Sequence, residues 1–227
     1  MIRILWSGIT GKTGKMAYEL SKDMDNLKIV AGLSRMDEHF YKYDELYDIK
    51  EEYDIIIDFS HKDVFDDVLR LAIDRQKPII IGTSGLSEEQ EKKIKEAANI
   101  IPVFRGGNFR LEVKRFIDEI VNYAESYDEE KIELTEIHYK TMNVPSETAK
   151  VIKSRVLEET GKEIVINSSL QDKENTNYWQ VGDICYKCPV YDEKIIEDIF
   201  TIAEVMSKKE ELGLYDLDCL FKEGDIQ

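Results

Sequence analysis

The first half of the chain alternates short apolar runs with amphipathic stretches, and this alternation constrains the fold more than any other feature. The apolar runs recur about every 20 to 25 residues, at 2–6, 28–33, 53–59, 78–81 and 100–104. Each run is too short for an average helix and has the length of a strand that is buried on both faces. We therefore predict a strand at each of them.

The stretches between these runs have helical periodicity, and we predict helices over 12–21, 63–75 and 88–98. The second has an apolar face made by Val64, Phe65, Val68, Leu69 and Ala72. Ser87 followed three residues later by Gln90 is a capping-box signature for the third. Apolar strands separated by helices predict a Rossmann-like, doubly wound α/β domain with a parallel sheet.

The pattern changes after Gly106-Gly107. The sequence then predicts a helix over 111–125, a strand over 132–139, a helix that begins after Pro145-Ser146 and ends at Gly161, strands over 163–168 and 177–186, and a helix over 193–208. Strands joined by long helices, without the earlier regular alternation, predict a second, smaller α+β domain.

The chain is acidic, with 47 Asp and Glu against 31 Lys and Arg and a net charge of −16. This charge argues against nucleic acid or a membrane as a partner, because both are bound by basic surfaces; a small anionic ligand is compatible, since it responds to its local pocket. The three cysteines form an odd set, no secretory segment is recognisable, and no apolar run approaches the roughly 18 residues of a membrane span. We therefore expect a cytoplasmic protein.

Cys185-x-x-Cys188 has the spacing of half a zinc site. The chain offers only Cys219 in addition, and residues three apart on a strand point to opposite faces. We therefore expect no metal.

A glycine-rich turn, Gly8-x-x-Gly11-x-x-Gly14, follows the first predicted strand and begins the first helix. Gly11-Lys12-Thr13 suggests a P-loop, but that motif requires a glycine where this chain has Trp6. The spacing is a relaxed form of the dinucleotide turn, in which glycines let backbone amides approach a pyrophosphate at a helix N-terminus. A purely structural tight turn is the alternative.

Ser34 and Arg35 follow the second predicted strand, where the ribose of a dinucleotide would lie. An acidic residue there would favour NADH, whereas a hydroxyl and a guanidinium suit a 2′-phosphate. We therefore favour NADPH over NADH, and the alternative is a solvated loop arginine.

The chain carries seven motifs in the order found in one enzyme family. They are Gly8-x-x-Gly11-Lys12-Thr13-Gly14, Asp58-Phe59-Ser60, Ile81-Gly82-Thr83-Ser84-Gly85, Asn108-Phe109, Glu136-x-His138-Tyr139 with Pro145-Ser146-Glu147-Thr148-Ala149, Gly182-Asp183-Ile184, and Glu211-x-x-x-Tyr215-Asp216. Over essentially the whole chain they resemble dihydrodipicolinate reductase, now called 4-hydroxy-tetrahydrodipicolinate reductase. The resemblance implies an NAD(P)H-dependent enzyme, usually a homotetramer, that reduces a cyclic dicarboxylate, 4-hydroxy-tetrahydrodipicolinate, to tetrahydrodipicolinate in lysine and diaminopimelate biosynthesis.

The resemblance also divides the chain and assigns a cofactor site. It implies a dinucleotide-binding domain of residues 1–107 plus 206–227 and an inserted substrate-binding and oligomerisation domain of residues 108–205. The cofactor-binding residues that it implies are Gly8, Ile9, Thr10, Gly11, Lys12, Thr13, Ser34, Arg35, Gly82, Thr83, Ser84, Gly106, Gly107, Asn108 and Phe109.

His138 is the catalytic residue that the resemblance implies. A histidine can donate the proton that accompanies hydride transfer, and its cationic form attracts a dicarboxylate. The alternative is a histidine with a purely structural role, whose ring nitrogens are hydrogen-bonded within the protein. The helix after Pro145 presents backbone amides to one carboxylate. The implied substrate-binding residues are Tyr139, Ser146, Glu147 and Thr148.

The substrate loop departs from the family pattern. Tyr139 replaces a second histidine, Met142 replaces a catalytic lysine, and the loop is one residue shorter; Lys140 could take the lysine's place or lie in solvent. Glu147 replaces the glycine of a Ser-Gly-Thr motif and should repel a dianion by about 1 to 4 kcal/mol unless its side chain points to water. A catalytically silent dinucleotide-binding relative and a reductase with a shifted substrate are therefore alternatives.

Overall fold

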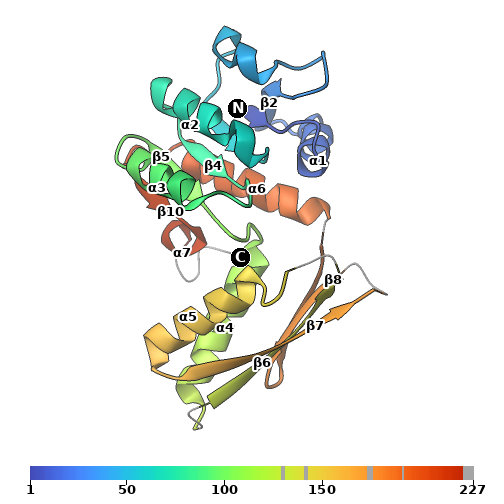
Figure 1. Ribbon diagram of the computed structural model, residues 1–227, viewed down its shortest axis with the longest axis vertical. Helices are drawn as coiled ribbons and strands as arrows, with labels where there is room; N and C mark the ends of the chain where they lie inside the picture. The colour runs from blue at the N-terminus through green and yellow to red at the C-terminus, as the bar shows by residue number, and fades with distance from the viewer. Residues whose placement is uncertain (129–130, 141–142, 173–175, 191, 222–227) are drawn as a thin grey trace. The chain divides into compact units, whose positions relative to one another are not determined.

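The computed structural model describes the chain except for residues 129–130, 141–142, 173–175, 191 and 222–227 (Figure 1). The chain forms two compact units. The first contains residues 1–106 and the chain from Glu193 onward, and the second contains Gly107–Asp192.

The first unit contains a parallel six-stranded sheet in the order β10-β5-β4-β3-β1-β2. Its strands are β1 (Ile2–Ser7), β2 (Leu27–Leu33), β3 (Ile55–Asp58), β4 (Ile79–Ile81), β5 (Pro102–Arg105) and β10 (Gly213–Tyr215). Its helices are α1 (Lys12–Ser21), η1 (Tyr43–Asp48), α2 (Lys62–Asp74), α3 (Glu88–Ala97), α6 (Glu193–Met206) and α7 (Leu217–Leu220). This architecture confirms the predicted Rossmann-like doubly wound fold.

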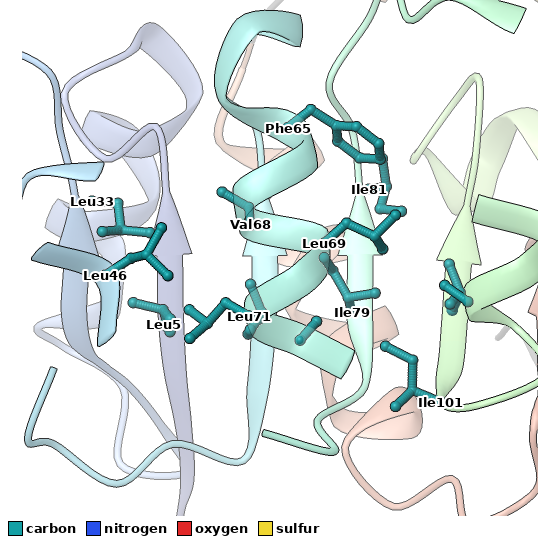
Figure 2. Packing of buried hydrophobic residues seen from close by; sticks show 14 of the residues in the cluster. Leu5, Leu33, Leu46, Phe65, Val68, Leu69, Leu71, Ile79, Ile81 and Ile101 are labelled. Atoms are coloured by element: carbon teal, nitrogen blue, oxygen red, sulfur yellow. The ribbon is translucent and has the colours of Figure 1, made fainter. Parts of the chain in front are cut away.

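Helices cover both faces of this sheet because its strands are apolar on both sides. Figure 2 shows the face on which Phe65 and Leu69 of α2 point toward Ile79 and Ile81 of β4. Leu5 of β1 belongs to this same apolar cluster. The next residue, Trp6, faces the other layer, where its ring meets Phe200 of α6 edge-on at 6.4 Å between centroids. Alternation along β1 therefore supplies apolar contacts to both layers.

The second unit contains a four-stranded mixed sheet in the order β7-β6-β8-β9. The strands are β6 (Lys131–Tyr139), β7 (Glu163–Gln171), β8 (Thr176–Val181) and β9 (Ile184–Pro189), and β6 is parallel to β7 and antiparallel to β8. Helices α4 (Leu111–Ser126) and α5 (Glu147–Thr160) pack together, and their apolar side chains form one cluster with those of the sheet.

A partly buried ion pair ties the two ends of the second unit together. The Arg110 guanidinium lies 2.7 Å from the Asp192 carboxylate and donates to the carbonyl of Pro189 at 3.0 Å. Because Gly107 and Asp192 are the first and last residues of this unit, the pair joins the segments at which the chain enters and leaves it.

Two sequence predictions were wrong. The strand predicted over 177–186 is a hairpin of β8 and β9 with a turn at Gly182, whose φ is +55°. The second unit also ends earlier than the predicted residue 205, because α6 packs on α1, β3 and β4 of the first unit. Its buried Ile196, Ile199 and Phe200 cover that sheet, so the amphipathic pattern identified the helix without identifying its partner.

Phe65→Ala should lower the free energy of unfolding by about 3 to 5 kcal/mol, because it removes a fully buried ring from the cluster of Figure 2. Urea denaturation followed by circular dichroism measures this loss. Met36→Ala, at an exposed position, is the control and should change stability by less than about 0.5 kcal/mol. A loss below about 1 kcal/mol for Phe65→Ala would contradict the packing described here.

Candidate functional site

The glycine turn connects β1 to α1 with little space for side chains. Gly8 has a φ of +83°, and a Cβ there would lie 2.3 Å from the carbonyl oxygen of Phe59. A Cβ on Gly14 would lie 2.4 Å from the carbonyl oxygen of Gly8. The amides of Gly8 and Ile9 both donate to the carbonyl of Leu33 at 3.1 Å, which fixes the turn against the end of β2. Glycine is therefore required here by the backbone itself.

Helix α1 begins at the same turn without a side-chain cap. Gly11 is its N-cap residue in an extended conformation, and it has no side chain that could accept a hydrogen bond from the first turn. Thr10 lies beside it, with its hydroxyl 3.1 Å from that of Ser34. An uncapped helix N-terminus preceded by glycines fits the pyrophosphate of a dinucleotide, because backbone N–H groups and the helix dipole both favour an anion there.

Ser34 and Arg35 have different surroundings at the end of β2. Ser34 is buried, and its hydroxyl accepts hydrogen bonds from the amides of Met36 and Asp37 at 3.3 and 3.2 Å, so it stabilises its own turn. The side chain of Arg35 is 46% exposed and its guanidinium lies 3.4 Å from both Asp63 Oδ2 and His61 Nδ1. Arg35 thus places a positive charge at the carboxyl end of β2, and the nearby Asp63 carboxylate partly neutralises it.

Asp58 joins the carboxyl ends of β3 and β4. It is fully buried and accepts hydrogen bonds from the hydroxyls of Ser60 and Thr83, both at 2.6 Å. Burial raises the pKa of the Asp58 carboxyl, and these hydroxyls oppose that rise. The residue belongs to a family motif that the sequence analysis quoted, but its role in holding the β3 and β4 ends was missed.

The segment Gly82–Ser84 is held from several sides. A Cβ on Gly82 would lie 2.3 Å from the Phe59 ring, and the Thr83 hydroxyl also accepts from the amide of Ser60 at 3.0 Å. The carbonyl of Thr83 accepts from the Arg105 guanidinium at 3.1 Å. Ser84 is exposed. The predicted cofactor residues of this loop therefore lie at the carboxyl edge of the parallel sheet, where dinucleotides bind in such folds.

The segment around Asn108 lies at the chain crossing between the units. Gly106 is the last residue of the first unit before the crossing. In the second unit, Asn108 donates to the Thr148 hydroxyl of α5 at 3.1 Å and accepts from the amide of Arg110 at 2.9 Å. Gly107 and Phe109 flank it, and Phe109 is buried.

His138 of β6 is fully buried and belongs to a polar cluster to which neighbouring strands contribute. Its Nδ1 is 2.8 Å from Asn177 Oδ1 of β8, and its Nε2 is 2.9 Å from Glu136 Oε2. Its ring is packed edge-on against Trp179, with 5.1 Å between centroids. The sequence analysis predicted His138 as a functional residue but missed Glu136 and Asn177 as its partners.

Glu136 is the centre of this cluster. Its carboxylate accepts from the amide of Ser146 at 3.1 Å, from the Ser146 hydroxyl at 2.6 Å and from the Ser168 hydroxyl at 2.5 Å, in addition to His138. Burial acts to raise the pKa of Glu136, but the hydrogen bonds from Ser146, Ser168 and His138 outweigh it and lower the pKa. A buried carboxylate is tolerated when its oxygens are hydrogen-bonded in this way.

The other predicted substrate residues are distributed between the interior and the surface. Ser146 and Thr148 are buried, and the Ser146 hydroxyl caps α5 by accepting from the amide of Ala149 at 3.1 Å. The side chain of Glu147 is 67% exposed and pairs with Lys150 at 2.6 Å.

The Glu147 side chain therefore points to water and has a cationic partner. This is the arrangement for which the sequence analysis expected no repulsion of a dianion. Tyr139 is half-buried and Lys140 is exposed, with its amide bonded to the carbonyl of Gln171 at 2.8 Å. Met142, where the family pattern has a lysine, lies outside the described residues.

Within the described part of the chain, no group of His, Cys, Asp and Glu is arranged to hold a metal ion. Cys185 is exposed and Cys188 is buried on β9. Among those same residues, no helix is long and apolar enough to cross a bilayer.

Known proteins resemble this chain in sequence and in fold. Residues 2–109 match the family described as dihydrodipicolinate reductase, N-terminus. The 4-hydroxy-tetrahydrodipicolinate reductases of Caldanaerobacter subterraneus subsp. tengcongensis and Clostridium novyi are 35% and 31% identical to it. These matches cover 67% and 74% of this chain, and this chain spans 62% and 68% of the two relatives. A dipicolinate-bound dihydrodipicolinate reductase from Paenisporosarcina sp. TG-14 has the same fold, with a TM-score of 0.72 at 19% identity over 95% of this chain and 97% of that chain.

A glycine turn at the point where a parallel sheet reverses its order is typical of the dinucleotide-binding proteins of the Rossmann class. Within that class, the sequence matches are decisive. The chain belongs to the 4-hydroxy-tetrahydrodipicolinate reductase family, whose members are NAD(P)H-dependent oxidoreductases.

Asp58→Asn should remove a pH-dependent loss of stability. Because burial raises the pKa of Asp58 in the folded state, the native protein holds this proton more tightly than the unfolded chain does. The contribution of Asp58 to the stability of the unaltered protein therefore falls as pH rises above about 3.9, the pKa of an unfolded Asp. Asp58→Asn lacks this term, so its unfolding free energy relative to the unaltered protein should increase between about pH 4 and 7. Urea titrations across that range measure the difference, and a constant difference would contradict the assignment.

Proposed function

We propose that this chain catalyses the NAD(P)H-dependent reduction of 4-hydroxy-tetrahydrodipicolinate to tetrahydrodipicolinate in lysine and diaminopimelate biosynthesis, as a cytoplasmic homotetramer. The observation that carries the proposal is the glycine turn, in a chain of this reductase family. The turn lies where the order of the sheet reverses, and its backbone packs so closely that a Cβ on Gly8 or Gly14 would overlap neighbouring backbone atoms. The first unit binds the cofactor, and the second unit binds the dicarboxylate.

The residues of the first unit fit a dinucleotide. The turn Gly8–Thr13 and the uncapped N-terminus of α1 hold the pyrophosphate, with the amides of Gly8, Ile9 and Gly11 bonded within the protein so that they fix the shape of the turn. Arg35 binds the ribose end, and Gly82–Ser84 forms the carboxyl edge of the sheet. Gly106–Phe109, where the chain crosses from the first unit to the second, is the remaining segment that we assign to cofactor binding. The bound cofactor supplies a hydride, while the chain orients the ring and excludes water from it.

The residues of the second unit fit a dianion of modest size. The first turn of α5 presents backbone amides, and Thr148 is fixed there by Asn108. His138 carries positive charge in the same unit when both of its ring nitrogens are protonated. Tyr139, Lys140, Ser146 and Glu147 border these groups along the chain. The reduction adds one hydride and one proton to the substrate and releases the 4-hydroxyl as water, and we assign the delivery of that proton to His138 and Lys140.

The proposed turnover is tested with freshly generated substrate, in an assay that couples its synthesis to oxidation of NADPH or NADH. We expect cofactor oxidation that requires the dicarboxylate and that Gly11→Asp abolishes, since a carboxylate at the turn repels the pyrophosphate. Tight cofactor binding without any turnover would overturn the activity and leave the family assignment intact. Turnover of another cyclic imine at a higher rate would reassign the substrate.

The preference for NADPH rests on Arg35. Arg35→Ala should weaken NADPH binding by about tenfold and leave NADH binding nearly unchanged, because only NADPH has the 2′-phosphate. Asp63→Asn should strengthen NADPH binding, since it removes the carboxylate that neutralises Arg35. Calorimetric titration of both cofactors measures the dissociation constants. Arg70→Ala, which removes an exposed arginine from α2, is the matched control. Equal losses for both cofactors in Arg35→Ala would contradict the assignment.

A further inference from the structure

The two ring nitrogens of His138 both face oxygen atoms. Nδ1 lies 2.8 Å from Asn177 Oδ1, and Nε2 lies 2.9 Å from Glu136 Oε2. A neutral imidazole has a single N–H and would leave one nitrogen lone pair against an oxygen lone pair. The doubly protonated ring satisfies both contacts, so the geometry favours an imidazolium.

Asn177 presents its amide oxygen to the histidine. Its Oδ1 is the atom that lies 2.8 Å from Nδ1 of His138. An amide oxygen only accepts hydrogen bonds, so this contact requires a proton on Nδ1.

Glu136 has the complementary arrangement. Every hydrogen bond described for its carboxylate comes from a donor: the amide and hydroxyl of Ser146, the hydroxyl of Ser168 and Nε2 of His138. An ionised carboxylate only accepts, so it satisfies all of these donors at once. Four donors around a fully buried anion fix its position more tightly than a single ion pair would.

We infer that Glu136 is a positioning residue, which holds His138 as an imidazolium in one ring orientation and ties it to Ser146 at the N-terminus of α5. The tie is direct, because Ser146 is the N-cap of α5 and donates both its amide and its hydroxyl to Glu136. Trp179 closes the cluster, with its indole N–H donating to the Ser146 hydroxyl at 3.2 Å and its ring against His138. The Glu136 carboxylate thus fixes both the orientation of the His138 ring and the position of Ser146 at the N-terminus of α5.

The charged groups around His138 come from several elements. Glu136 is on the same strand, and the Cys188 thiol of β9 lies behind Asn177. Beyond Cys188, the Arg110 guanidinium at the start of α4 is paired with Asp192. On α5, Glu147 and Lys150 are exposed and paired with each other. Among the described residues, Glu136 is the charged group for which a direct contact with the imidazole is found.

The consequence for turnover rests on the proposed function. In the proposed reaction His138 delivers a proton to the substrate. Glu136 fixes the orientation of the ring that carries this proton. It acts through His138 and is expected to contact neither the cofactor nor the dicarboxylate.

The protonation state is tested first on the unaltered protein, without any assay of turnover. The ¹⁵N chemical shifts of the histidine ring nitrogens at pH 8 separate an imidazolium from a neutral ring. The chain has three histidines, and His39→Gln and His61→Gln assign the two exposed ones. We expect two protonated ring nitrogens on His138 at pH 8. A neutral His138 ring at that pH would overturn the inference, and this outcome does not depend on the substrate.

Glu136→Gln then tests the positioning role. We expect His138 to lose one ring proton at pH 8 and kcat to fall at least about tenfold, with the dissociation constant of NADPH unchanged. Glu136→Asp keeps the charge but shortens the side chain, so it should retain the protonated ring and recover part of kcat. Glu133→Gln, at an exposed position on the same strand, is the matched control and should change neither.

The outcomes separate the two proposals. A Glu136→Gln variant that keeps both His138 protons and full kcat would overturn the positioning role while the reductase activity stands. An unaltered protein that lacks turnover but shows the doubly protonated ring would overturn the activity and leave the role of Glu136 supported. If Glu136→Gln does not fold, the ¹⁵N measurement on the unaltered protein still decides the protonation state.

Discussion

The close approach of the glycine turn to the neighbouring backbone is the constraint on which the first unit depends. Gly8 lies so near the carbonyl of Phe59 that a single added carbon would overlap it, and its amide is bonded to Leu33 on the other side. The turn therefore sits between the ends of β2 and β3, where the sheet order reverses. The same glycines that allow this packing leave α1 without a side-chain cap, so the structural requirement and the anion site have one cause.

The second unit is organised around a polar centre as well as an apolar core. Burying Glu136 and His138 is costly unless their polar atoms are paired, and residues of β6, β7, β8 and α5 supply that pairing. Such a cluster has one satisfied arrangement, whereas apolar side chains tolerate several. The orientation of His138, the residue to which we assign proton delivery, is therefore fixed by hydrogen bonds on both sides of its ring.

Much of the fold was predictable because its signals are local. Runs such as Ile55–Ile57 and Ile79–Ile81 are buried on both faces, and Ser87 caps α3 as its spacing predicts. The break at Gly182 was missed because the β-type runs on its two sides were read as one strand, although Gly182-Asp183 between them is a two-residue turn signal. Alternation places Glu136 and His138 on one face of β6. Ser168 and Asn177, however, reach them through strand pairing, which a single sequence does not specify.

The division of the chain also sets an order of events during synthesis. The second unit is one continuous segment, so all of it has been made once residue 192 leaves the ribosome. The first unit at that moment still lacks α6, which covers one face of its sheet, and β10, which forms its edge. The nascent chain thus carries a complete inserted unit together with a sheet whose apolar layer under α6 is uncovered, and exposed apolar surface of this kind makes a folding intermediate prone to aggregation.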